Sequence, residues 1–232
     1  SSIRGIAHRS GERLVVNESR PPIANLDELP IPDRKAIWIG CPSSRAYLFT
    51  SRGCPYRCVF CASTRFWPKL RQFSASYVAD EIDHIANVLG IWEIHFFDDL
   101  FIVPKKRLDA IIEILSAKGL LGKIAFSGAV RANLVNDALC ESLKRLGVRE
   151  VMFGAESFSE KSLGYLKCNT VTPEQNQNAI DVLCRHGIKT NVAMIFGCPT
   201  DTEEEIGKSF LALESNLSSG KINKWSRGVL RP

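Results

Sequence analysis

The chain has 232 residues, of which 45% are hydrophobic and 24% are charged, and it carries a formal net charge of +5 at pH 7. This composition excludes a mainly disordered chain, because it can bury the core of one large or two small domains. It also excludes a membrane span, since no apolar run approaches the ~20 residues that crossing a bilayer requires. The first residues are basic but lack the apolar centre of a secretory signal. We therefore expect a cytoplasmic protein without a membrane partner.

Positive charge is concentrated at the start of the chain. Residues 1–72 hold twelve Lys or Arg and five Asp or Glu, whereas the rest holds eighteen and twenty. Such a segment either binds nucleic acid or phosphate, or it forms a solvated basic rim around one loop. Because runs of like charge are usually solvated surface, we do not expect nucleic acid as a partner.

Residues 1–45 are predicted to form an extended arm or linker that packs on the rest of the chain. The segment contains five prolines and shows no helical periodicity. We therefore expect a domain boundary here, with the core in residues 46–232.

From Ser74 onward, a recurring pattern predicts helices that alternate with strands. In each of five repeats an amphipathic stretch ends at a glycine, which favours the left-handed conformation that closes a helix, and a β-rich run follows. Two helix starts are marked by Thr172-Pro173 and by Thr202-Glu203. With a first strand at Ala46–Ser51, the expected strands are Ile91–Phe97, Lys123–Ser127, Glu150–Phe153, Lys189–Phe196 and Lys224–Leu230.

This alternation predicts the α/β class, with parallel strands joined by right-handed crossovers. Six units fall short of a full eight-fold barrel. We therefore expect a partial (β/α)6 TIM-like barrel, with an open doubly wound sheet as the alternative. The chain stops directly after its sixth expected strand, so we expect the core to be truncated at its C-terminus.

Both architectures place a ligand site at the carboxyl ends of the strands. The side chains best suited to chemistry follow those ends in the sequence: Cys54, Cys58 and Cys61 after the first strand, Asp98 and Asp99 after the second, Ser127 and Arg131 after the third, and Glu156 after the fourth. We therefore expect these side chains to meet on one rim of the sheet.

Three cysteines crowd the loop after the first expected strand, at Cys54, Cys58 and Cys61. Dense cysteine in a chain without a secretory signal indicates metal binding or catalysis more often than disulfides. Three thiolates can hold a four-iron cluster and leave one iron open to a substrate or cofactor. Zinc is the alternative, although zinc sites usually add a second Cys pair or His ligands, and no second pair follows here.

The spacing C-x3-C-x2-C, with the aromatic Phe60 before its last cysteine, resembles the signature of the radical S-adenosylmethionine (radical SAM) superfamily. Phe96–Asp99, Phe153–Ser157 and Ile195–Pro199 resemble the ends of that family's second, fourth and fifth strands, in the same order. Leu26–Arg34 resembles the linker that joins a cobalamin-binding domain to the core in one subgroup. The chain is thus similar to a radical SAM core that lacks its upstream cobalamin domain.

The resemblance implies a [4Fe-4S] cluster held by the three cysteines, with S-adenosylmethionine chelated to its open iron. Reduction would cleave S-adenosylmethionine to methionine and a 5′-deoxyadenosyl radical, and the electron would come from a donor such as flavodoxin or ferredoxin. It further implies a methyl-transfer type of enzyme that uses cobalamin in the full-length protein. No motif identifies the substrate, and a small molecule is expected.

The resemblance also assigns contacts with S-adenosylmethionine to six residues: Phe60, Asp98, Asp99, Ser127, Arg131 and Glu156. The acidic side chains would accept hydrogen bonds from its amino group or ribose, and Arg131 would grip its carboxylate. Phe60 would pack against the cluster or the adenine. Residue chemistry alone also allows structural roles for these six residues. Asp98, Asp99 and Ser127 could cap local backbone, and Glu156 and Arg131 could form a salt bridge with each other. Phe60 could simply pack in the core.

Two other functions stay open. A methylthiotransferase-like enzyme that acts on RNA or protein would share the core, and the basic segment would then give salt-dependent RNA binding. A non-catalytic module would use zinc or an iron–sulfur cluster only to stabilise its fold. Zinc would give neither colour nor a paramagnetic reduced state.

Overall fold

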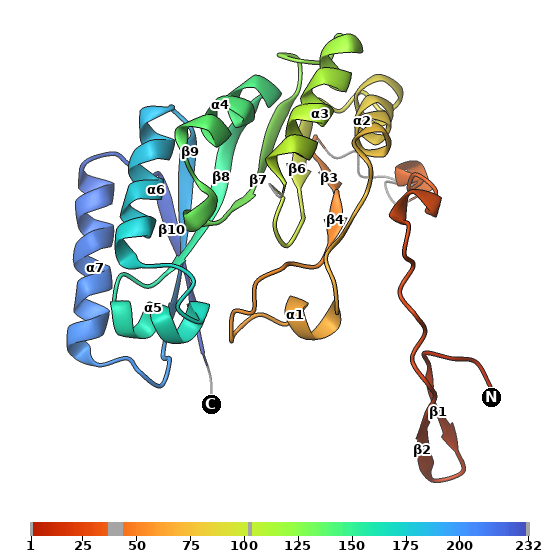
Figure 1. Ribbon diagram of the computed structural model, residues 1–232, viewed down its shortest axis with the longest axis horizontal. Helices are drawn as coiled ribbons and strands as arrows, with labels where there is room; N and C mark the ends of the chain where they lie inside the picture. The colour runs from red at the N-terminus through yellow and green to blue at the C-terminus, as the bar shows by residue number, and fades with distance from the viewer. Residues whose placement is uncertain (1, 37–43, 102–103, 231–232) are drawn as a thin grey trace.

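The main element of the molecule is a six-stranded sheet in which every neighbouring pair of strands is parallel. A computed structural model describes residues 2–36, 44–101 and 104–230 (Figure 1). Across the sheet the strands are β3 (Ala46–Leu48), β6 (Glu93–Phe96), β7 (Ala125–Val130), β8 (Val148–Glu156), β9 (Lys189–Phe196) and β10 (Lys224–Val229). Because this order follows the chain without a reversal, the sheet winds in one direction, as in a barrel and unlike a doubly wound sheet. The predicted partial barrel is confirmed.

Helices connect the strands and cover one side of the sheet. They are α2 (Ala75–Asp83, continued by a π-helix over His84–Val88), α3 (Lys105–Ala117), α4 (Asp137–Leu146), α5 (Glu160–Lys167), α6 (Pro173–Arg185) and α7 (Glu203–Ser218). Figure 1 shows α2, α3, α4, α6 and α7 ranged along the sheet in chain order.

The helix boundaries follow the local signals in the sequence. Thr172 caps α6 in a capping box with Gln175, and Thr202 caps α7. All five glycines expected to close a helix have positive φ. At Gly147 the need is also steric, because a Cβ atom would lie 2.8 Å from the carbonyl oxygen of Ile124.

The core lies between the sheet and these helices. Alternate side chains of β7 are buried, among them Phe126 and Val130, while the side chains between them are only partly buried. The ring of Phe126 stacks with that of Phe96 on the neighbouring strand. The opposite, concave face of the sheet carries the partly buried side chains between them, Ser127 among them.

Two sequence predictions need correction. β7 extends to Val130, so Ser127 lies within the strand and not at its carboxyl end. The strand continues because the Gly128–Val130 segment keeps the alternation of buried side chains. The N-terminal segment also does not pack on the core throughout, because its hairpin of β1 (Ala7–Ser10) and β2 (Arg13–Val16) projects from the molecule (Figure 1).

Two short 3₁₀ turns, Leu26–Glu28 and Arg34–Ala36, tie the N-terminal segment to the core. The buried guanidinium of Arg34 donates to the Glu81 carboxylate on α2 at 2.5 Å and to a backbone carbonyl of β3. Asp27 accepts a hydrogen bond from the backbone N–H of Ser74, the N-cap of α2. Within the described part of the chain, no helix combines the length and apolar character that crossing a membrane requires.

Candidate functional site

The cysteines lie on a loop at the carboxyl end of β3. The chain runs from β3 into a two-residue strand, β4 (Ser51–Arg52), which pairs antiparallel with β5 (Arg71–Gln72). The 18 residues between them form the cysteine loop, residues 53–70, which includes the short helix α1 (Ser63–Phe66). Gly53 enters the loop at φ +92°, and a Cβ atom there would lie 3.0 Å from the carbonyl oxygen of Lys69. The two ends of the loop can therefore approach this closely only because residue 53 is a glycine.

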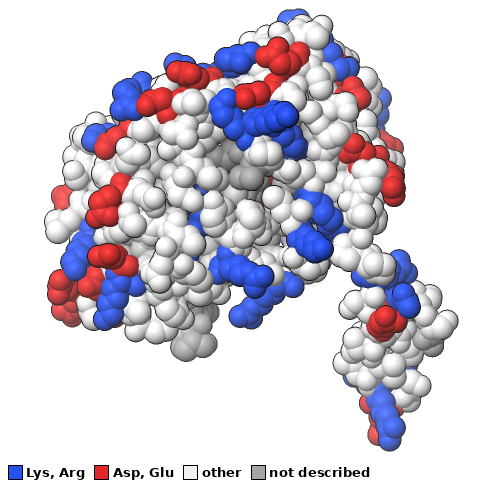
Figure 2. Space-filling view, in the orientation of Figure 1, with Lys and Arg blue, Asp and Glu red and all other residues white. Residues whose placement is uncertain are grey.

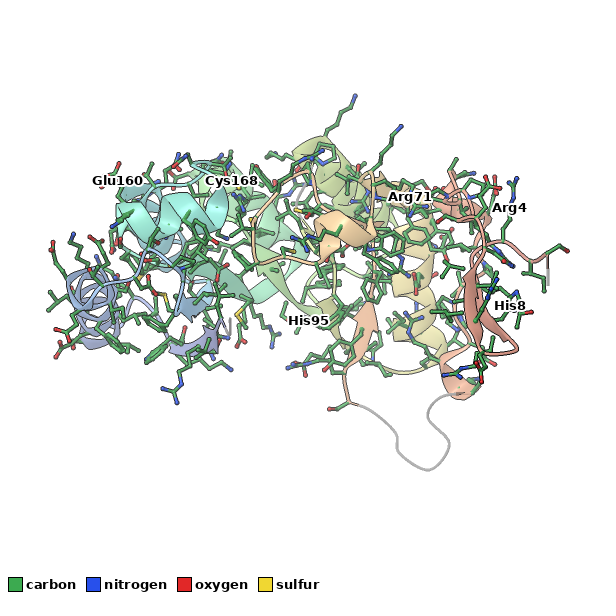
Figure 3. All side chains as sticks on the ribbon, turned by 90° about the horizontal axis from the view of Figure 1, so that it is seen from below. Arg4, His8, Arg71, His95, Glu160 and Cys168 are labelled. Carbon is green, nitrogen blue, oxygen red and sulfur yellow. The ribbon has the colours of Figure 1, made fainter. Side chains whose placement is uncertain are left out.

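Contacts with α5 hold the middle of the cysteine loop in place. The backbone N–H of Val59 donates to the carbonyl of Leu166 at 3.1 Å, and the thiol of Cys168 donates to the carbonyl of Arg57 at 3.1 Å. Figure 3 labels Arg71 on β5 and Cys168 just after α5, the two places between which the loop extends. The loop thus bridges the first strand of the sheet and the helix that follows β8.

The three cysteines are free thiols, with Cys58 buried and the other two partly buried. Burial raises the pKa of the Cys54 thiol, and the charges of Cys58 and Cys61 raise it further, whereas Arg131 lowers it. Cys58 and Cys61 are therefore close enough to Cys54 to influence it electrostatically.

Among the described residues, no three His, Cys, Asp or Glu side chains gather as a single metal ion requires. Zinc needs ligands within about 2.0–2.3 Å of one point, whereas a four-iron cluster spreads its thiolates over separate iron atoms.

Arg131, directly after β7, lies against the cysteine loop and is only 6% exposed. Its Nη1 donates to the Cys58 Sγ at 3.3 Å, and its Nη2 donates to Thr170 Oγ1 at 2.5 Å. The guanidinium carbon lies 3.8 Å from the centre of the Tyr56 ring. Its buried Nε has no hydrogen-bond partner among the residues that the structure describes. The fork expected to grip a carboxylate is thus already engaged by groups of the protein.

Glu156 ends β8 at a bulge and has the left-handed φ of 63°, which is rare outside glycine. Its Oε1 accepts a hydrogen bond from Lys167 Nζ at 3.0 Å, and both side chains are buried. The salt bridge considered for Glu156 therefore forms with Lys167 and not with Arg131. Gly154 permits it, because a Cβ atom there would lie 2.5 Å from Glu156 Oε1. Backbone strain of this kind is concentrated at functional sites.

Sequence reasoning missed Lys167, whose Nζ also lies 5.6 Å from the centre of the Phe60 ring. A signal was present. Lys167 follows Leu163 by four positions and so lies on the buried face of α5. A lysine on an apolar helix face is rarely buried unless it has a partner.

The two aspartates hold the segment that leads into the cysteine loop and the short helix α1 within the loop. The buried carboxylate of Asp98 accepts hydrogen bonds from the backbone N–H and hydroxyl of Thr50 at 3.0 and 3.1 Å, and from the Ser51 hydroxyl. Burial raises its pKa, and these hydrogen bonds oppose the rise. Asp99 is exposed and accepts from the Ser63 hydroxyl at 2.7 Å, at the start of α1. Neither aspartate caps a helix.

Ser127 lies apart from the cysteines, on the concave face of the sheet. Its hydroxyl is 2.8 Å from the Nδ1 atom of His95 on the neighbouring strand. Both residues precede the carboxyl ends of their strands, and Ser127 lines a cavity of about 650 Å³ that opens toward the amino ends. Burial lowers the pKa of His95, and the Arg45 charge lowers it further.

The radical SAM superfamily model matches residues 48–213. A curated relative, an uncharacterized methyltransferase of Pyrococcus horikoshii, is 32% identical over 211 residues, which cover 88% of this chain and 45% of the relative. The anaerobic magnesium-protoporphyrin IX monomethyl ester cyclase of Rubrivivax gelatinosus is 26% identical, over 90% of this chain and 38% of its own length. The chain thus spans less than half the length of these curated relatives.

Solved structures share the fold. The cobalamin-dependent S-adenosylmethionine radical enzyme OxsB, with aqua-cobalamin and S-adenosylmethionine bound, aligns with a TM-score of 0.76 at 24% identity, covering 92% of this chain and 32% of that one. The radical S-adenosylmethionine methyltransferase TsrM from Kitasatospora setae, with cobalamin and a [4Fe-4S] cluster bound, aligns with a TM-score of 0.70 at 20% identity, covering 79% and 34%.

Proposed function

Because this chain belongs to the radical SAM superfamily, we propose that it is an enzyme core that holds a [4Fe-4S] cluster on Cys54, Cys58 and Cys61 and binds S-adenosylmethionine. The cluster would supply the electron that cleaves S-adenosylmethionine to methionine and a 5′-deoxyadenosyl radical. The observation that carries the proposal is the group of three free thiols on one loop, fixed at the carboxyl ends of a partial barrel.

The other residues of the site would position the cofactor. Asp98 has its carboxylate engaged by the turn before the cysteine loop, so its role is to hold that loop. Asp99 is exposed and has a carboxylate oxygen left to accept from the cofactor amino group. Among the described residues, Glu156 accepts a hydrogen bond only at Oε1, so Oε2 is the acceptor offered to a ribose hydroxyl or the amino group. Phe60, half-buried on the loop, would pack against the cluster or the adenine.

For the whole protein we propose methyl transfer that uses cobalamin. Two observations support it: the 32% identity with a protein named as a methyltransferase, and the linker-like residues Leu26–Arg34, whose 3₁₀ turns fasten to α2 and β3. A second candidate is methylthio transfer, which the 26% identity with a putative methylthiotransferase of Methanocaldococcus jannaschii favours. Salt-dependent RNA binding by the chain would support the second candidate.

Electron paramagnetic resonance of the anaerobically reconstituted, dithionite-reduced chain tests the core proposal. We expect a reduced four-iron signal that changes when S-adenosylmethionine is added, together with release of 5′-deoxyadenosine. Stoichiometric zinc with no iron signal would contradict the proposal and favour a structural zinc module. An iron signal that does not change when S-adenosylmethionine is added would favour a structural iron–sulfur module.

The electron donor would dock on the cysteine loop. Residues 51–79 contain five Arg or Lys and no Asp or Glu. Among them Arg57, Arg65 and Lys69 are exposed and make no ion pair with described residues, and we call these three the basic loop surface. On the face shown in Figure 2, Lys and Arg atoms gather over the region of α1, and no Asp or Glu atoms lie among them. This surface would attract an acidic carrier protein such as flavodoxin or ferredoxin.

Reversing that charge should slow electron delivery. We expect the triple variant R57E/R65E/K69E to be reduced by flavodoxin at least about tenfold more slowly at low ionic strength, because steering by charge raises association rates by 10–10³. The difference should shrink at 1 M salt, where the screening length is about 3 Å. Stopped-flow absorbance of the cluster measures the rate.

A matched control reverses three exposed cations at the amino ends of the strands, in the variant K123E/R149E/K189E. This variant changes the net charge by the same amount as R57E/R65E/K69E, but we expect flavodoxin to reduce it at the parental rate. Photoreduced deazaflavin, which needs no docking surface, should reduce all three proteins at one rate. Equal slowing of both triple variants by flavodoxin would contradict a docking site on the basic loop surface.

A further inference from the structure

We propose that Arg131 sets the reduction potential of the iron–sulfur cluster through its hydrogen bond to Cys58. This inference rests on the proposed function, since it needs the cluster on the three cysteines. It gives Arg131 a role different from gripping the carboxylate of S-adenosylmethionine. The starting observation is the 3.3 Å contact between the Nη1 atom of Arg131 and the Cys58 Sγ.

Two groups of the protein, Thr170 and Tyr56, hold the guanidinium beside Cys58. Thr170 accepts from Nη2 at 2.5 Å, and the Tyr56 ring, itself part of the cysteine loop, lies 3.8 Å beneath the guanidinium carbon. The Tyr56 hydroxyl accepts a hydrogen bond from Asn133 at 3.0 Å. A side chain held in this way does not need to be ordered again when it binds a ligand, so its charge stays at the sulfur.

Burial gives the contact its strength. Arg131 is 6% exposed and Cys58 is 9% exposed, so water screens the charge little. No carboxylate forms an ion pair with Arg131 among the described residues, and its Nε lacks a hydrogen-bond partner. A buried cation that lacks a carboxylate partner is costly unless another negative group faces it. A thiolate bound to a cluster is such a group.

The consequence concerns the electron affinity of the cluster. Reduction adds one negative charge to the cluster and its thiolates. A cationic donor that hydrogen-bonds to one of those sulfurs stabilises the reduced form more than the oxidised form. Hydrogen bonds to the sulfurs and solvent exposure are recognised determinants of cluster potentials. Arg131 therefore raises the potential and eases reduction by the external donor.

The test is a redox titration, monitored by electron paramagnetic resonance, of the anaerobically reconstituted chain without S-adenosylmethionine. We expect R131Q and R131M to lower the equilibrium constant for reduction about tenfold, which is about 59 mV for a one-electron couple. R131K, which keeps the charge but loses the fork, should shift less. The exchangeable proton coupling of the Nη1 donor, seen by electron–nuclear double resonance, should disappear in R131M.

The controls separate a role in tuning from a structural role. R149Q removes an exposed cation at the amino end of β8 and should leave the potential unchanged. Y56L removes the ring under Arg131 and should lower the potential partway, whereas Y56F keeps the ring, loses only the hydrogen bond from Asn133 and should lower the potential less than Y56L. If R131M does not retain iron, R131K and Y56L still supply the comparison.

The outcomes distinguish the inference from the proposal on which it rests. A parental chain that shows no four-iron signal contradicts the proposed function itself. A parental cluster that responds to S-adenosylmethionine, with an unchanged potential in R131Q and R131K, overturns only the inference. Weaker binding of S-adenosylmethionine with an unchanged potential would return Arg131 to the carboxylate-gripping role.

Discussion

Replacing Cys58 with serine is expected to abolish cleavage of S-adenosylmethionine to the level of a protein-free control. Each of the three thiolates would hold a different iron, so the loss of one ligand leaves a second iron without a protein partner. A serine hydroxyl is a harder ligand than a thiolate, and iron–sulfur clusters select soft thiolate ligands. Iron and sulfide content, together with chromatography of 5′-deoxyadenosine, measure the effect. C54S and C61S should behave alike.

The control is C184S, at an exposed cysteine on α6 outside the cysteine loop. It should keep the parental iron content and the parental cleavage rate. The prediction is wrong if C58S retains four irons per chain and still releases 5′-deoxyadenosine. It is also wrong if C184S loses as much iron as C58S, since the assembly would then depend on thiols in general.

Replacing Lys167 with methionine is expected to lower the free energy of unfolding by about 3–5 kcal/mol, because it leaves the buried Glu156 carboxylate without its partner. The side chains of both residues are less than a tenth exposed, so water cannot compensate for the lost charge. The double variant E156Q/K167M should recover much of that loss, since replacing both members of a buried pair is often close to neutral. Urea unfolding of the iron-free chain, followed by circular dichroism, measures the three values.

The matched control breaks an exposed pair instead. R145M removes the partner of Glu113, at 2.8 Å on neighbouring helices, and should cost at most about 1 kcal/mol because both side chains are more than half exposed. A K167M chain as stable as the parent would show that the Glu156–Lys167 pair does not hold the end of β8. A double variant no more stable than K167M would show that packing, and not charge, sets the loss.

The sequence by itself determined the alternation of helices and strands, because its signals act over a few residues. The capping box of Thr172 reaches only to Gln175, and the glycine that closes a helix acts on the turn next to it. Right-handed crossovers between alternating helices and strands fit both a barrel and a doubly wound sheet, and the strand order in the structure decided for the barrel. The same locality allowed the cysteine loop to be predicted, since its three candidate ligands lie within eight residues. The family resemblance drawn from that loop is confirmed by the match over residues 48–213.

Only the tertiary structure decided which groups surround the cysteines. Arg131 contacts Cys58, 73 positions away in the sequence, and Asp98 contacts Thr50, 48 positions away. The sequence around Arg131 or Asp98 therefore gives no indication of its partner. The bulge before Glu156 turned that side chain toward Lys167. Such pairings depend on strand register and on how α5 packs against the cysteine loop. The packing of the whole barrel determines the strand register and the position of α5. The periodicity of one segment determines only which side chains of that segment share a face.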